Sequence, residues 1–307
     1  MTAVIKTEKL TKYYGKYRGI IDVDLEVQEG ESFGFLGPNG AGKTTMIRTL
    51  LDHIRPTSGR ATIFGIETTA DPVAIHKRLG YLPGEFALYD KLTGGQTLDY
   101  FANLRGGMDR TYQRQLIERL EIDPTRKFRE LSKGNKQKIG LVIALQHRPD
   151  LLLLDEPTSG LDPLIQQEFY AVIREAKDEG RTVFLSSHIL SEVEKTCDRV
   201  AIIRGGELAR VDRTEALRDL AHHQVELVFT GPVPVDAFSS LPGVSDVTAE
   251  DHVLRMRVSG NITDVVRKAA QFELADFISR EPSLEETFLA EYSKPAADEP
   301  AVEVAAR

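Results

Sequence analysis

Three short segments of the chain carry residue types suited to binding and cleaving a phosphate chain. The first segment, GPNGAGKT, follows the pattern GxxxxGK[ST] and begins at Gly37. Glycines let the backbone curve so that its N–H groups point at phosphate oxygens, while the lysine contacts the terminal phosphates and the hydroxyl suits Mg²⁺. We therefore predict a triphosphate site made by these residues: Gly37, Pro38, Asn39, Gly40, Ala41, Gly42, Lys43, Thr44 and Thr45.

The other two segments are apolar strands that end in polar residues. Leu151–Leu154 is followed by Asp155 and Glu156, and a strand over 182–185 leads to His188. At the carboxyl ends of central strands, Asp155 would approach the Mg²⁺ held by Thr44, and Glu156 could polarise an attacking water. His188 is placed to contact the γ-phosphate. Taken alone, each has a plainer interpretation: the acids as a helix cap or solvated turn, and the histidine as a structural residue.

The spacing of apolar residues predicts the elements that position these groups. Strand 33–36 precedes the glycine-rich loop, and a helix follows it with apolar residues at helical spacing: Met46, Ile47, Leu50, Leu51 and Ile54. Strands alternating with helices predict a largely parallel sheet. Before residue 31 the pattern differs, since Ile21, Val23, Leu25 and Val27 alternate with acidic residues and so favour an antiparallel sheet with one buried face. A glycine-rich turn without function is disfavoured in this context.

Two further regions have their own organisation. Residues from about 95 to 145 are predicted to form an inserted helical subdomain within an α/β domain spanning 1–220. Strands and helices over 223–293 follow the order βαββαβ, which favours a small α+β, ferredoxin-like domain. Its last helix would start at a capping box made by Ser283 and Glu286. The tail, 294–307, has few large apolar residues and is predicted to be disordered.

Composition limits the classes of function. The 307 residues carry a net charge of −8, which argues against broad contact with nucleic acid. The chain shows neither a secretory signal nor an apolar run of the roughly 20 residues that span a membrane. We therefore expect a cytosolic protein. Cys197, the single cysteine, falls on one helical stripe with Ile189 and Val193 and is predicted to be a core thiol.

Taken together, the segments GPNGAGKT, LSKGNKQK, LLLLDEPTSGLD and SSH resemble the nucleotide-binding subunits of ATP-binding cassette (ABC) transporters, over residues 3 to 220. The most diagnostic part is Leu131–Asn135, which resembles the cassette signature that other phosphate-loop proteins lack. The resemblance implies a P-loop NTPase cassette, with an antiparallel β subdomain, that hydrolyses ATP with Mg²⁺. It also implies that Tyr14 stacks on adenine, with Tyr13 and Tyr17 as weaker candidates. The alternative is that Tyr14 simply packs on the sheet.

The resemblance further implies partners. Ser132, Gly134 and Asn135 would face a γ-phosphate bound by another chain, in a homodimer or a cassette heterodimer. The loop 159–162 would link the two sites, although Asp162 and Pro163 also suit a helix cap and first helical position. An integral membrane permease subunit would hold the pair on the inner face of the cell membrane.

Two segments depart from the family pattern. The signature commonly has a second glycine and a glutamine where this chain has Lys133 and Asn135. Cassette proteins also usually carry a glutamine that touches Mg²⁺ and the membrane partner, at a position that is Gly84 here. We expect Glu85 to be a substitute metal ligand, because carboxylate oxygens bind Mg²⁺. Flexible backbone and solvent are the alternative.

The segments YLPGEFALYDKLTG, LSKG and EPSLEETFLAEY most resemble exporter ATPases of the daunorubicin and bacitracin-resistance kind. The implied function is to power export of a drug, lipid or peptide by ATP-driven closure of a dimer. The C-terminal domain would pair or regulate subunits, or only stabilise them. The alternatives are a cassette ATPase without transport, as in iron–sulfur assembly, and a phosphoryl-transferring kinase.

Overall fold

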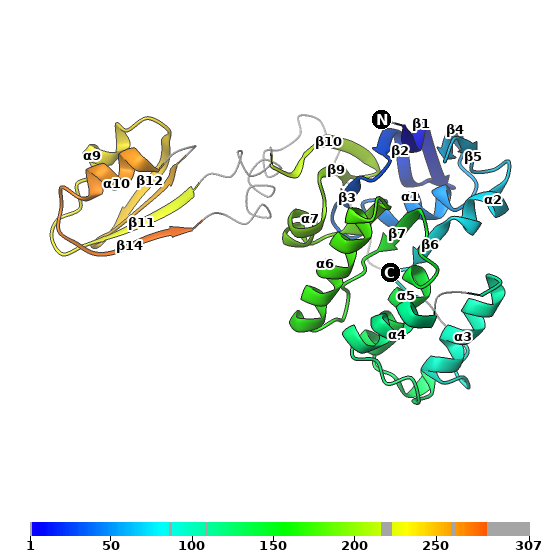
Figure 1. Ribbon diagram of the computed structural model, residues 1–307. Coiled ribbons are helices and arrows are strands. Elements are labelled where there is room, and N and C mark those ends of the chain that lie inside the picture. Colours follow the sequence, from blue (N-terminus) through cyan, green and yellow to red (C-terminus); the bar gives the residue numbers. More distant parts are fainter. Residues whose placement is uncertain (1, 86–87, 108–109, 216–222, 259–261, 281–307) are drawn as a thin grey trace, which may run out of the picture. The chain divides into compact units, whose positions relative to one another are not determined.

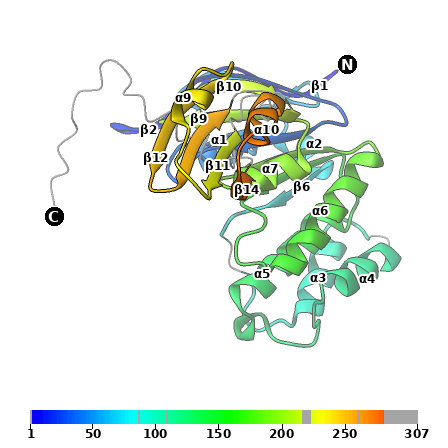
Figure 2. The ribbon, with the colours of Figure 1, turned by 90° about the vertical axis from the view of Figure 1, so that its left-hand side faces the viewer.

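The computed structural model describes residues 2–85, 88–107, 110–215, 223–258 and 262–280 (Figures 1 and 2). The chain divides into two compact units, Met1–Thr214 and Glu215–Arg307. The predicted capping box at Ser283 and the tail 294–307 lie outside the described residues. Among the described residues, no helix is long and apolar enough to cross a bilayer.

An antiparallel sheet opens the first unit, with strand order β2-β1-β4-β5. Its strands are β1 (Ala3–Tyr14), β2 (Tyr17–Gln28), β4 (Ser58–Ile63) and β5 (Ile66–Glu67). Val23, Leu25 and Val27 are buried while the acids between them are exposed, so the period-two pattern correctly predicted a sheet with one buried face. Register shifts interrupt the β1–β2 pairing at several points.

A six-stranded sheet forms the centre of the unit, in the order β10-β9-β3-β8-β7-β6. Neighbouring strands run parallel except for β9 and β10. The bounds are β3 (Ser32–Leu36), β6 (Leu79–Leu82), β7 (Leu151–Asp155), β8 (Thr182–Ser187), β9 (Arg199–Arg204) and β10 (Glu207–Arg213). Every residue of β3, β7 and β8 is buried, as expected of parallel strands covered on both faces.

Helices connect and cover these strands. Helix α1 packs against β2 and β4 of one sheet and β7 and β8 of the other, while α6 and α7 pack on each other and on β8. The bounds are α1 (Lys43–Leu50), α2 (Pro72–Lys77), α6 (Pro163–Asp178) and α7 (Leu190–Thr196). Asp162 caps α6 by accepting from the N–H groups of Leu164 and Ile165, with Pro163 in the first position. The cap predicted at Asp162 is therefore present.

Helical elements fill the region between β6 and β7 (Figure 1). Helix α5 contacts α3, α4 and β6, and so joins this region to the central sheet. The bounds are α3 (Gly94–Leu104), α4 (Arg110–Arg119), the 3₁₀ turn η1 (Phe128–Glu130) and α5 (Lys133–Leu145). A capping box between Thr93 and Gln96 fixes the start of α3.

In the part of the second unit that the structure describes, an antiparallel sheet with strand order β12-β13-β11-β14 is accompanied by two helices. Along the chain the order is β11 (His223–Phe229), α9 (Val235–Ser239), β12 (Val244–Glu250), β13 (Val253–Val258), α10 (Thr263–Ala269) and β14 (Leu274–Arg280). Its core includes the aromatic cluster of Phe229, Phe238 and Phe272. One face of the sheet is therefore buried under the helices.

Two local predictions were wrong. Helix α1 ends at Leu50, so Ile54 lies beyond the helix that was predicted to contain it. Ile189 and Cys197 do not share a helical stripe, because they flank α7 as its first and last cap residues. Ile189 is 38% exposed, whereas Cys197 is buried, and burial raises the pKa of its thiol to about 12. The thiol is therefore in the core, without the stripe that was the reason for expecting it there.

Candidate functional site

The glycine-rich loop lies between β3 and α1, where the carboxyl ends of parallel strands meet. Gly40 and Gly42 have φ of 81° and 111°, a region that side chains rarely adopt. A Cβ atom on Gly42 would lie 2.4 Å from the carbonyl oxygen of Gly19. The loop can therefore follow this path only with glycine there, and it begins a helix whose N-terminus favours anions.

Lys43 is held at the centre of the loop. Its side chain is only 6% exposed, and Nζ donates to the carbonyl oxygens of Gly37 at 2.7 Å and Pro38 at 3.1 Å. It also lies 3.1 Å from Oε1 of Glu156, which compensates the buried charge. A buried ammonium beside the curved backbone is what a phosphate chain requires. The loop and Lys43 therefore suit a nucleoside triphosphate.

Hydroxyl and carboxylate oxygens gather beside Lys43. The hydroxyl of Thr44 donates to Oδ2 of Asp155 at 2.8 Å, and the hydroxyl of Ser186 donates to Oδ1 of Asp155 at 2.5 Å. These groups come from α1, β7 and β8, so the parallel strands bring distant segments together. Small hard cations such as Mg²⁺ prefer oxygen ligands, and Thr44 with Asp155 suits such an ion.

Glu156 occupies a strained position directly after β7. Its φ is 49°, which is uncommon for a residue with a side chain, and its N–H donates to the carbonyl oxygen of Ser186 at 3.1 Å. The carboxylate contacts Lys43 through one oxygen and Nδ1 of His188 through the other. Strain of this kind persists where the surroundings hold it and is frequent at active sites. A basic oxygen is thus fixed next to a lysine and a histidine.

A pocket opens over the loop, lined by these residues: Arg18, Gly19, Asn39, Gly40, Gly42, Lys43, Thr44, Thr45 and Glu156. Tyr14 lies at its side, because a Cβ on Gly19 would be 3.1 Å from the Tyr14 ring and 2.8 Å from the Thr45 methyl group. The Tyr14 side chain is 43% exposed, with Lys12 Nζ 5.4 Å from the ring centre. An exposed ring beside the pocket is available for stacking.

The signature residues form a separate group. Ser132 caps α5 by accepting from the N–H of Asn135 at 3.3 Å. A Cβ on Gly134 would lie 2.3 Å from the carbonyl oxygen of Gly160, so only glycine allows this close approach. Ser132, Gly134 and Asn135 do not line the pocket over the glycine-rich loop.

Gly84, and not Glu85, is the residue placed directly against Asp155. A Cβ on Gly84 would lie 3.3 Å from the Asp155 carbonyl oxygen and 3.6 Å from its carboxylate oxygen Oδ2. Glu85 is exposed. Among the described residues, the hydroxyl and carboxylate of the Thr44–Asp155 pair bond to each other and to Ser186, and neither is paired with Glu85.

Sequence reasoning missed two residues that hold the site together. Gln137 is buried, and its amide donates to the carbonyl oxygens of Glu156 at 3.4 Å and Pro157 at 3.2 Å. Ser186 is the second hydroxyl on Asp155. Gln137 lies at helical spacing from Gly134, and Ser186 directly precedes Ser187-His188. Nearness in sequence to predicted site residues was therefore the only indication that either of them belongs to the site.

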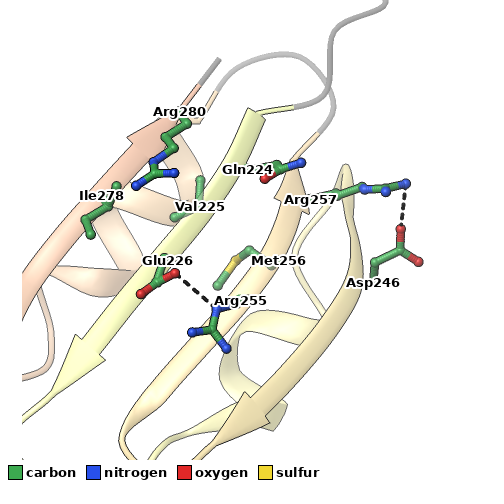
Figure 3. Close-up of a pocket in the computed structure, with 9 residues that line it drawn as sticks. All are labelled: Gln224, Val225, Glu226, Asp246, Arg255, Met256, Arg257, Ile278 and Arg280. Carbon is green, nitrogen blue, oxygen red and sulfur yellow. Dashed lines mark hydrogen bonds and ion pairs between the residues drawn. The ribbon is translucent and has the colours of Figure 1, made fainter. Parts of the chain in front are cut away.

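A second pocket lies on the open face of the C-terminal sheet (Figure 3). Its charged side chains come from β11, β12, β13 and β14, and two pairs are joined: Glu226 with Arg255 at 3.0 Å and Asp246 with Arg257 at 3.1 Å. Both pairs are well exposed. None of the residues predicted for chemistry lies in this pocket.

The chain is similar to known transporter proteins. The family model described as ABC transporter matches residues 20–159. The bacitracin transport ATP-binding protein BcrA of Enterococcus faecalis is 32% identical over 260 residues, which cover 83% of this chain and 84% of that protein. BcrA of Bacillus licheniformis is 40% identical over 211 residues, 68% of this chain and 69% of that protein. The match of 260 residues is longer than the first unit, which ends at Thr214, and it therefore reaches into the second unit.

Solved structures share the fold of the first unit. A structure described as the ATP-binding subunit of an ABC transporter matches with a TM-score of 0.65 and 29% identity, covering 70% of this chain and 92% of that chain. A bacterial ABC transporter cassette described as dimeric matches with a TM-score of 0.63 and 24% identity, covering 68% of this chain and 98% of that chain. The predicted P-loop cassette fold is thereby confirmed.

Proposed function

The chain belongs to the family of ABC transporter ATP-binding proteins, and from that premise we propose that it works in pairs to power export through a separate membrane permease. Relatives named for bacitracin transport support export of a drug, lipid or peptide. The iron–sulfur assembly alternative gains no support from these relatives. The permease would hold the pair on the inner face of the membrane.

The predicted residues in and around the first pocket receive these roles. Lys43 and the N–H groups of the glycine-rich loop hold the triphosphate, and Tyr14 stacks on adenine. Thr44 and Asp155 hold Mg²⁺, which when bound neutralises charge on the phosphates. Glu156 accepts a proton from the attacking water, and His188 holds Glu156 and contacts the terminal phosphate. Glu85 is proposed as a further ligand in place of the family glutamine, because it follows Gly84 at the edge of Asp155.

One observation carries the proposal of a shared site. The pocket is lined by the glycine-rich loop, Glu156, Arg18 and Gly19, whereas Ser132 and Gly134 of the same chain do not line it. Negative charge on the terminal phosphate must be stabilised from all sides for transfer to be fast. The hydroxyl and backbone N–H groups of a second chain's signature would supply the other side when two chains close.

A mixed dimer tests this arrangement. In a twofold pair, one Lys43→Ala chain and one Ser132→Arg chain give one doubly damaged site and one intact site. We expect ATPase activity from the mixed dimer, isolated through two different tags, although each variant alone is inactive. A dimer of wild type with Lys43→Ala shows whether one good site can turn over. If that control is active and the double-mutant pair is inactive, the shared site is wrong.

Membrane partnership needs a separate test. Gentle solubilisation of membranes, capture of the full chain and mass spectrometry should recover a protein with several membrane-spanning helices in stoichiometric amount. Recovery of soluble proteins only, from membranes in which the chain is abundant, would contradict the permease proposal.

We also propose that the second unit has the ferredoxin-like fold and forms a domain over 223–293, after a cassette domain over 1–220. The element order and the strand order β12-β13-β11-β14 support it, because the motif's first and third strands, β11 and β13, are central, with the second strand beside the third and the fourth beside the first. The match to BcrA reaches into this unit, which favours a role shared with that exporter protein.

A further inference from the structure

Glu192 is a buried carboxyl that belongs to none of the contacts described so far. It lies on α7, only 1% exposed, and its Oε2 accepts a hydrogen bond from the hydroxyl of Ser187. Its Oε1 is buried without a well-formed hydrogen bond among the residues that the structure describes, although the Thr158 hydroxyl is near enough to stabilise the carboxylate. A carboxylate removed from water is costly, so its presence in this position needs a reason.

Ser187 connects this carboxyl to the residues around the phosphate loop. Its hydroxyl oxygen accepts from the N–H of Ile189 at 2.9 Å, which closes a tight turn around His188. Its backbone carbonyl accepts from the N–H of Gly37 at 3.1 Å. His188, at the tip of the turn, contacts Glu156. A chain of contacts therefore runs from Glu192 through the turn to Glu156.

We propose that Glu192 is a positioning residue for ATP hydrolysis: by fixing the Ser187 hydroxyl, it fixes the turn that holds His188 against Glu156. The inference rests on the proposed roles of Glu156 and His188. The hydroxyl of Ser187 has two acceptors within reach, the Glu192 carboxylate and the Ile189 carbonyl oxygen at 3.3 Å, and the shorter bond to Glu192 favours the orientation in which the same oxygen accepts from the Ile189 N–H. Without that acceptor, the Ser187 side chain is left with its bonds to the backbone of Ile189, and the turn is held less firmly.

The surroundings of Glu192 allow a neutral acceptor to do the same work. Burial raises the pKa of this carboxyl to about 7, while the hydroxyls of Ser187 and Thr158 lower it and the charge of Glu156 raises it. Tyr170 on α6 and Cys197 after α7 are the other titratable groups that feel its charge. Because the protonated carboxyl is accessible near neutral pH, a negative charge is not needed for positioning. What matters is the acceptor oxygen and the shape of the side chain. Glutamine retains both features.

The first test compares three full-length variants. Glu192→Leu removes the acceptor, Glu192→Gln keeps it, and Val193→Ala removes buried methyl groups from the same helix and serves as the control for general loosening. We expect Glu192→Leu to lower kcat for ATP by about 10- to 100-fold with KM little changed, because small misplacements of catalytic groups cost rates of this order. Glu192→Gln and Val193→Ala should keep a wild-type kcat at temperatures where thermal scans show them folded.

The second test asks whether the effect passes through the turn. Ser187→Ala, a small change, should reproduce the loss of kcat, and the double variant with Glu192→Leu should be no worse than either change alone. On a His188→Ala background, Glu192→Leu should have no further effect. Amide hydrogen exchange over residues 188–191 should be faster in Glu192→Leu and Ser187→Ala than in Val193→Ala, and this measurement is independent of turnover.

Several outcomes would overturn the inference. Additive losses in the double variant would mean that Glu192 acts independently of Ser187. A Glu192→Gln enzyme as slow as Glu192→Leu, or exchange at residues 188–191 unchanged by Glu192→Leu, would also contradict it. Failure of the proposed function has a different signature, since Glu156→Gln and His188→Ala would then hydrolyse ATP at the wild-type rate whatever the Glu192 variants do.

Discussion

The two units of this chain are built from the same parts, strands covered by helices, yet they place charge in opposite ways. In the first unit, Lys43 and Asp155 are buried where parallel strands end, and their charged and hydroxyl partners come from distant segments of the chain. In the second unit, Arg255 and Arg257 lie on the open face of an antiparallel sheet, 50% and 41% exposed, and pair with nearby acids.

The difference shows what each sheet can do with polar side chains. Parallel strands bring their carboxyl ends to one edge, so residues such as Thr44, Asp155 and Ser186 meet although they are far apart in sequence. There, water is largely excluded and each charge depends on its partner. On the open sheet face, water screens each pair. Removal of a charge should therefore have a large effect in the first unit and a small one in the second.

Replacement of Lys43 should have the largest effect. Lys43→Ala removes the buried ammonium that offsets phosphate charge, and we expect hydrolysis to fall by at least about 100-fold, mainly through weaker nucleotide binding. Steady-state ATPase assays and nucleotide titrations measure both quantities. Lys268→Ala, which removes a lysine from the second unit, is the matched control and should leave both unchanged. Normal turnover by Lys43→Ala would show that the site lies elsewhere.

Glu156→Gln separates binding from chemistry in the same pocket. The amide keeps the shape of the side chain but loses the basic oxygen, so ATP affinity should persist while cleavage falls by about 100-fold or more. Nucleotide binding and single-turnover hydrolysis should be measured on the same preparation. If the variant fails to bind ATP, Glu156 has a structural role in holding Lys43.

Much of this pocket was predictable from sequence, because most of its residues belong to one continuous motif, although its lining residues Arg18 and Gly19 were not predicted. For the loop from Gly37 to Thr44 and the buried strand ending at Asp155, the local sequence is enough to predict the local structure. Gln137 and Ser186 could not be found this way, since their roles consist of contacts with segments 19 to 31 residues away. The exposed cap position of Ile189 was likewise hidden, because its spacing alone suggested a helix.

In the second unit, too, local structure was predictable from sequence but contacts between strands were not. Strands and their order were predicted for this unit, and in β11 and β13 every second residue is buried: Val225, Leu227, Leu254 and Met256. The sequence of one strand does not determine which residues of the neighbouring strand pair with it. The contact between Arg257 and Asp246 depends on register, and a bulge interrupts the β12–β13 pairing between Ser245 and Thr248.

A smaller effect is expected at the edge of the first pocket. Glu85→Ala should lower Mg²⁺-dependent hydrolysis, or its stimulation by the membrane partner, by a few-fold if this exposed acid replaces the family glutamine. Activity measured against Mg²⁺ concentration should shift to higher concentrations. The matched control is Glu67→Ala, an exposed acid on β5. Identical Mg²⁺ curves for wild type and Glu85→Ala would contradict the proposal that Glu85 replaces the family glutamine. The glutamine position would then be filled by Gly84, which has no side chain to bind the ion.

The smallest effect should come from the open face of the second unit. Arg257→Ala breaks the pair with Asp246, in which the side chains are 41% and 64% exposed. Because water replaces the lost partner, we expect the free energy of unfolding to fall by about 0–1 kcal/mol and ATPase activity to stay unchanged. Denaturant unfolding of Arg257→Ala, Asp246→Ala and the double variant gives the coupling energy of the pair. A coupling well above 1 kcal/mol, or a loss of ATPase activity comparable to that of Lys43→Ala, would show that this face is not simply solvated and that the contrast between the two units is wrong.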